Sequence, residues 1–101
     1  MNTYLLRFET KPTIGGENLG KFAGANWTVW VVSENVEDAM SRATDYAMDR
    51  GWQFEGGKDI HIVERAHFAD DVGLLHMFDT AQREGIAVLI DAFRKRITES
   101  N

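Results

Sequence analysis

The chain has 101 residues, 44% of them apolar, with a net charge of −5 and no cysteine. This length fits one domain with its own core, and the lack of cysteine excludes disulfides, thiolate catalysis and cysteine-ligated zinc. The negative charge argues against nucleic acid as a partner. No apolar run approaches the ~18 residues of a membrane span and no signal peptide is recognisable, so we expect a cytoplasmic protein without a membrane partner.

Two stretches in the first third of the chain are typical of strands. Thr3–Glu9 is rich in aromatic and aliphatic residues, with Tyr4, Leu6 and Phe8 on one face, and Trp27–Ser33 carries large apolar side chains at successive positions. Trp27 and Trp30 have opposite parity, so they should point to opposite faces of a sheet. A strand that is apolar on both faces should be covered on both.

The connection between these strands, Thr10–Asn26, is about seventeen residues long and rich in glycine. We expect it to be flexible, because connections of that length without structure are usually functional or disordered. Its central residues come within one position of the phosphate-binding pattern G-x-x-x-x-G-K-[ST]. However, Phe22 replaces the residue that would hold magnesium, and a strand follows where a helix is needed. We therefore interpret these residues as a flexible loop: Gly15, Gly16, Gly20 and Lys21.

Asn35–Arg50 is the clearest helix in the sequence. Asn35 can cap its start, and Gly51 can end it in a left-handed conformation. Apolar residues recur at spacings of three and four and form one narrow stripe: Val36, Ala39, Met40, Ala43 and Ala47. Three of them are alanine, which lets the helix lie close against a sheet. Trp52 should pack beneath this helix.

The segment Trp52–Phe68 is extended but contains two adjacent glycines. It is either a hairpin that turns at Glu55–Lys58, or one strand, Asp59–His67, preceded by an arm.

The last third predicts a helix followed by a strand. Asp70 or Asp71 would start the helix, which runs to Glu84 and is capped by Gly85. The β-branched residues after Gly85 then form a final strand. The alternative is one long helix with a glycine at its centre, which would cost about 1 kcal/mol.

These elements give the order β-β-α-β-α-β and a single α+β domain over residues 1–101. The economical packing is a three- to four-stranded, antiparallel-rich sheet with two helices on one face. Such a sheet leaves its second face bare, so we expect a second copy of the chain to cover it in a two-fold homodimer.

No set of side chains predicts a catalytic or metal site. Two histidines and two aspartates lie within ten residues (His67, Asp70, Asp71 and His76), but their spacing matches no established zinc site. On a regular strand Glu64 would point away from His61 and His67, which removes the simplest acid–base pair. We therefore assign no catalytic residue, no metal and no cofactor.

The favoured function is a non-catalytic protein–protein interaction module, such as an adaptor, inhibitor or immunity-like protein. It would be homodimeric, and its acidic surface could also meet a basic protein partner. Because Trp27 and Trp30 cannot both face the same helices, one of them should lie at an interface. The alternative is a small-ligand binder or small enzyme with a pocket between the 10–26 loop and the sheet. Its polar contacts would be three residues: His61, Arg65 and His67.

Several local patterns also resemble small bacterial α+β proteins of uncharacterised function. These are W-x-V-x-V from Trp27, the helix with an acidic start, Gly51-Trp52, and F-D-x-A-x-x-x-G-I-A-V-L over Phe78–Leu89. The resemblance covers Trp27–Leu89. It implies a fold and a bacterial origin, and it implies no activity.

Overall fold

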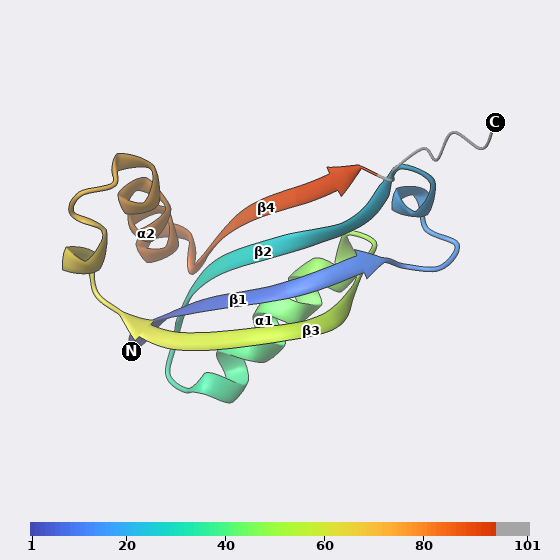
Figure 1. Ribbon diagram of the computed structural model, residues 1–101. Coiled ribbons are helices and arrows are strands. Elements are labelled where there is room, and N and C mark those ends of the chain that lie inside the picture. The colour runs from blue at the N-terminus through green and yellow to red at the C-terminus, as the bar shows by residue number, and fades with distance from the viewer. Residues whose placement is uncertain (95–101) are drawn as a thin grey trace.

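The computed structural model describes residues 1–94, apart from the side chain of Lys58. Within that range the chain forms a four-stranded antiparallel sheet in the order β3-β1-β2-β4 with two α-helices (Figure 1). The elements in chain order are β1 (Asn2–Pro12), η1 (Glu17–Gly20), β2 (Phe22–Ser33), α1 (Val36–Asp49), β3 (Trp52–Val63), η2 (Arg65–Phe68), α2 (Val72–Glu84) and β4 (Ile86–Arg94). The predicted α+β class, the element order and the final strand are confirmed.

Both α-helices begin and end at the residues that the sequence indicates. Asn35 and Asp71 each accept a hydrogen bond from a backbone N–H of the first turn, at 2.7 Å and 3.0 Å. Gly51 and Gly85 follow the helices with φ of 86° and 88°, a conformation that favours glycine. Local capping chemistry therefore fixes the length of each helix.

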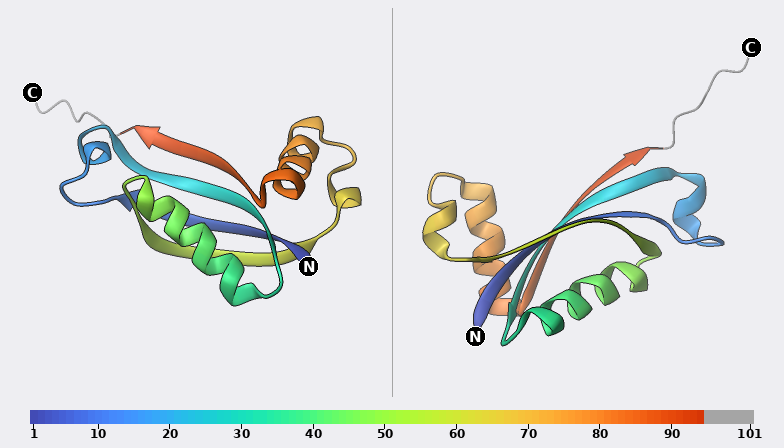
Figure 2. Two further views of the ribbon diagram at one scale, coloured as in Figure 1. Left: turned by 180° about the vertical axis from the view of Figure 1, so that it is seen from behind. Right: turned by 60° about the horizontal axis from the view of Figure 1, so that its bottom comes forward.

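The two helices pack on opposite faces of the sheet, so the prediction that both lie on one face is wrong. The alanine stripe of α1 lies against Trp27, and Phe78 and Ala81 of α2 lie in a separate cluster with Trp30. The sheet passes between the helices in the right-hand view of Figure 2. The physical reason is that β2 is apolar on both faces. A helix from the same chain covers each face, where a second copy was expected.

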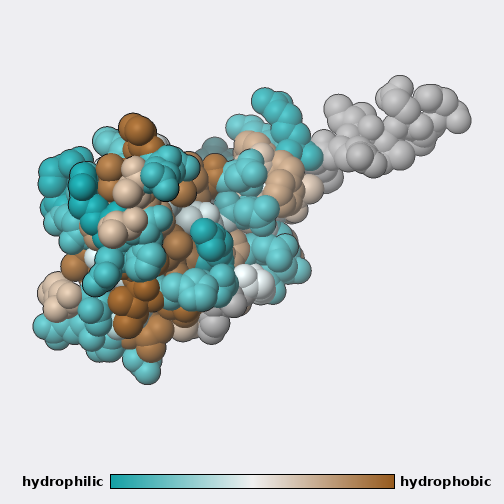
Figure 3. Space-filling view, turned by 60° about the vertical axis from the view of Figure 1, so that its left-hand side comes forward, coloured by the Kyte–Doolittle hydropathy of each residue, from teal (hydrophilic) through white to brown (hydrophobic). Residues whose placement is uncertain are grey.

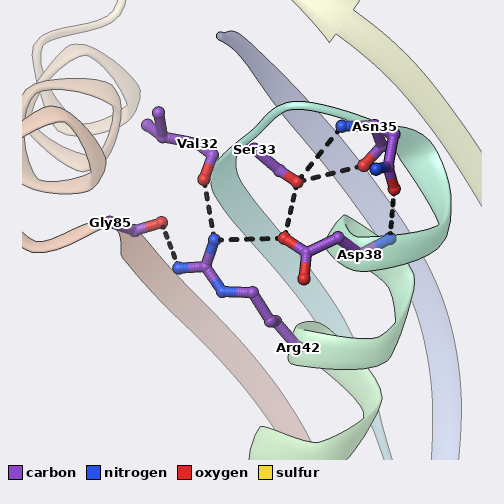
Figure 4. Close-up of polar contacts among 6 residues, drawn as sticks. All are labelled: Val32, Ser33, Asn35, Asp38, Arg42 and Gly85. Carbon is purple, nitrogen blue, oxygen red and sulfur yellow. Dashed lines mark hydrogen bonds and ion pairs between the residues drawn. The ribbon is translucent and has the colours of Figure 1, made fainter.

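Arg42 of α1 connects this helix to the start of β4 (Figure 4). Its guanidinium donates to the carbonyl of Val32 at 2.7 Å and to that of Gly85 at 3.1 Å, and it lies 3.7 Å from the carboxylate of Asp38. Asp38 also accepts a 2.6 Å hydrogen bond from Ser33. These contacts hold the first two turns of α1, the end of β2 and the residue before β4 together.

β3 is a single strand with an irregular register, so neither of the two predicted alternatives is correct. The pairing between β1 and β3 shifts on both sides of Glu9, next to Gly56 and Gly57. Gly57 has a φ of 67°, and a Cβ there would lie 2.6 Å from the Glu9 carboxylate. The adjacent Gly56 and Gly57 therefore form a β-bulge within one strand.

The connection between β1 and β2 covers residues 13–21, and its predicted length of about seventeen residues is wrong. Both strands extend further than their apolar centres indicate. The connection includes η1 and is anchored to the end of α1, because Asn18 donates to the carbonyl of Arg50 at 3.1 Å and Thr13 donates to that of Gly51 at 3.0 Å. Within residues 1–94, neither helix has the length and apolar character needed to cross a bilayer.

Candidate interaction surface

Both candidate tryptophans are inside the protein, with exposed fractions of 1% for Trp27 and 0% for Trp30. Trp27 stacks on Phe8 and donates its indole N–H to Thr10 Oγ1 at 2.8 Å. The indole N–H of Trp30 has no acceptor among the described residues. The prediction that one tryptophan lies at an interface is therefore wrong, because the two helices cover one tryptophan each.

His61, Arg65 and His67 lie near the C-terminal end of β3, and each has a partner within the chain. His61 Nε2 is 2.8 Å from the carboxylate of Asp59, and the Arg65 guanidinium binds Asp79 of α2 through two hydrogen bonds of 2.9 Å and 3.1 Å. His67 Nδ1 accepts a 2.8 Å hydrogen bond from the backbone N–H of Glu64. Arg65 and His67 thus fix the path of the chain from β3 into α2.

The Arg65–Asp79 pair shifts the pKa values of both groups. The hydrogen bond from Arg65 lowers the pKa of the Asp79 carboxyl below its usual value, and the same bond raises the pKa of Arg65. Both side chains are accessible to solvent, so the pair orients η2 on α2 and adds little to stability.

Glu64 and His67 are neighbours in the structure, which the assumption of a regular strand did not predict. The chain leaves β3 at Val63 and turns, so that the Glu64 side chain accepts from the backbone of His67 while His67 accepts from Glu64. Both groups are thereby used in starting η2. Among residues 1–94, no cluster of three or more His, Asp or Glu side chains could hold a metal ion.

A small apolar hollow of about 350 Å³ lies beside the 13–21 connection. It is lined by Thr13, Met48, Trp52, Gln53 and Phe54. His61 follows Phe54 by seven residues on β3, which corresponds to roughly 20 Å along an extended strand. The structure therefore does not bring His61, Arg65 and His67 to the loop, and the predicted polar pocket is not assembled. Gly15, Gly16, Gly20 and Lys21 stay in the connection itself.

Among the described residues, the backbone groups on the outer edge of β4 have no strand partner. Within residues 1–94, β4 pairs only with β2 and forms the upper edge of the sheet in Figure 1. Val32 donates its N–H to the carbonyl of Gly85 at 3.0 Å. Because an antiparallel ladder alternates, odd-numbered residues of β4 direct their peptide groups to β2 and even-numbered residues direct theirs outward. The outward-directed residues are Ile86, Val88, Ile90 and Ala92.

The same strand exposes large apolar side chains on both faces. Leu89 and Phe93, on the α2 face, are 47% and 45% exposed, and Ile90, on the α1 face, is 40% exposed. The neighbouring part of the α2 face is polar, with Arg7, Glu9 and Asn26 exposed. On the α2 face, the exposed apolar side chains of this part of the sheet therefore belong to β4.

The two sheet edges differ in how well they are protected against pairing. β3 contains the bulge at Gly56–Gly57 and then the charged residues Lys58 and Asp59, and η2 closes its end. Bulges and charges are the usual protection of an edge strand. Over Ile86–Ile90, β4 has neither a charge nor a proline nor a bulge. An edge of this kind is typical of a strand that pairs with another chain.

No protein-family model matches the chain, and no curated protein and no solved structure matches it either. The resemblance to small bacterial α+β proteins stays a prediction.

Proposed function

We propose that this chain is a non-catalytic protein–protein interaction module that works as a homodimer. The main support for this proposal is the outer edge of β4. Four residues there direct their peptide groups outward, and exposed apolar side chains lie on both faces of the strand. Antiparallel pairing of two β4 strands satisfies those peptide groups. It also joins the two sheets into one continuous sheet of eight strands.

A second copy suits this edge because antiparallel pairing of one strand with itself is two-fold symmetric. The axis lies perpendicular to the sheet, so that each face of one copy continues into the same face of the other. Closed two-fold dimers are the commonest homo-oligomers. Exposed apolar residues of one face then meet their own counterparts.

Two quantities favour the register in which Leu89 lies on the two-fold axis: the charge of Asp91 and the number of residues that can pair. With Asp91 on the axis, two carboxylates would be directly opposite each other, which is destabilising. With Ile90 on the axis, Leu89 would face Asp91 of the second copy. With Leu89 on the axis, Ile90 faces Val88 of the second copy, and residues 86–92 of each strand are paired. Leu89 then faces Leu89 at a non-hydrogen-bonded position, where side chains approach most closely.

Light scattering of the wild type and two lysine variants tests the proposal. Ile90→Lys places a charge on the paired edge and should give a monomer with an unchanged circular dichroism spectrum. Val72→Lys is the matched control, because it replaces a side chain that is 84% exposed on α2, away from β4. It should stay dimeric. A wild type that remains monomeric across a wide concentration range would refute the proposal, as would a dimeric Ile90→Lys.

A further inference from the structure

The opposite edge of the sheet has a groove between β3 and the start of α1. The groove has a volume of about 640 Å³, and three of its lining side chains are aliphatic: Val36, Ile60 and Ile62. Ile62 is 57% exposed and Val36 is 37% exposed. Figure 3 views the end of the molecule that carries this groove, and apolar side chains reach the surface in the lower part of that view, among hydrophilic ones.

The floor of the groove includes a short stretch of free strand edge. The alternation of the ladder directs the peptide groups of Val63, His61 and Asp59 toward β1 and those of Ile60 and Ile62 outward. The next outward N–H, that of Glu64, donates to His67 at 2.8 Å. Within the described part of the chain, the outward peptide groups of Ile60 and Ile62 therefore have no partner, and the turn at η2 blocks pairing beyond them. This edge fits a short extended segment.

The rim of the groove is acidic. Glu34 and Glu37 line it, both are exposed, and neither makes an ion pair with a side chain that the structure describes. Glu37 suits the first turn of α1 because of the helix dipole. Glu34 precedes the cap residue Asn35 and has no such role. Together they place two negative charges, without an ion-pair partner among the described side chains, beside an apolar strip.

We propose that this groove binds an extended segment of a partner protein that presents apolar side chains and a Lys or Arg on one face, at alternate positions. The segment would add a short strand to β3 and hydrogen bond to Ile60 and Ile62. Its apolar side chains on the α1 face would lie against Ile60, Ile62 and Val36, and a Lys or Arg would reach Glu34 and Glu37. Backbone pairing supplies affinity in this mode of recognition, and the side-chain sites supply specificity. The net charge of −5 favours the same partner.

A synthetic peptide with two valines and a lysine at alternate positions and threonine between them, blocked at both ends, tests this proposal by calorimetric titration, because its valines and its lysine then share one face. We expect binding that weakens at least about tenfold with a matched valine–glutamate peptide, because the rim charges then repel the ligand. Methylating the backbone nitrogens of the valine–lysine peptide should abolish binding, because the strand bonds are lost.

Variants of the protein locate the binding site. Ile62→Lys, and separately Glu34→Gln with Glu37→Gln, should each weaken binding at least about tenfold. Val72→Lys should leave it unchanged. All titrations are repeated with Ile90→Lys, so that peptide binding and dimerisation can succeed or fail independently. No binding of the valine–lysine peptide, equal binding of both peptides, or no effect of Ile62→Lys would overturn the proposal.

Discussion

Trp27 and Trp30 are buried equally but differ in the hydrogen bonding of their indole N–H groups. Trp27 donates to Thr10, whereas Trp30 has no acceptor among the described residues. A buried donor without an acceptor is destabilising, and an acceptor that loses its donor costs about 1–3 kcal/mol. The two residues therefore give a matched pair for measuring this difference in one protein.

We expect Trp27→Phe to lower the free energy of unfolding by about 1–3 kcal/mol more than Trp30→Phe. Both changes remove similar apolar volume. Only the first takes a donor away from the buried Thr10 hydroxyl, which keeps a single 3.4 Å hydrogen bond to the Ala25 carbonyl, while the second removes an unsatisfied donor. Urea unfolding followed by circular dichroism measures the difference. Adding Thr10→Val to Trp27→Phe should recover part of the loss. Equal losses for the two single variants would contradict this account of the core.

At the level of elements, the pair between Arg65 of η2 and Asp79 of α2 gives a dependence on pH. Because the folded pKa of Asp79 is lowered, its contribution to stability is fully present above the usual pKa of an aspartate. This contribution to stability is lost as the pH falls from about 4, the usual pKa of an aspartate, through the lower pKa that Asp79 has in the folded protein. A buried, unpaired carboxyl would have a raised pKa, and its effect on the pH dependence of stability would have the opposite sign.

Carboxyl NMR titration should find the pKa of Asp79 below its usual value in the wild type and closer to that value in Arg65→Gln. Arg83→Gln is the matched control, since the charge of Arg83 lowers the same pKa more weakly than the hydrogen bond of Arg65 does. It should produce the smaller change. An unshifted pKa of Asp79 in the wild type would show that η2 is not held on α2 by this pair.

The boundaries of the helices could be predicted because their signals are local. Asn35, Gly51 and Gly85 act on backbone groups within one turn of themselves. The path of β3 could not be predicted in the same way. Gly56–Gly57 suits a turn or a bulge equally well, and the choice depends on pairing with β1.

At the level of the whole molecule, the sequence could not predict what covers each face of the sheet. Trp27 and Trp30 indicate that both faces of β2 are covered, but a second helix and a second chain satisfy that pattern equally. The structure places α2 there. The candidate surface could not be predicted either, because Ile86–Ile90 becomes an edge only through the order of the strands.

In the proposed dimer, moving the contact from a sheet face to the β4 edge changes what would hold the two copies together. A bare apolar face would bury a large area without directional bonds, whereas pairing along the β4 edge would fix the direction and register of the second strand through peptide hydrogen bonds. Residues 86–92 would then determine assembly, and the buried Trp27 and Trp30 belong to the core.

Oxidation of a single introduced thiol tests the β4 pairing most directly, because the natural chain has no cysteine. With Leu89 on the two-fold axis, the two Cβ atoms at position 89 lie within about 1 Å of the separation that a disulfide needs. Leu89→Cys should therefore form a covalent dimer rapidly. Ile62→Cys and Phe93→Cys, at similarly exposed positions away from the axis, should do so slowly. Cross-linking of Leu89→Cys no faster than that of Ile62→Cys would contradict the account.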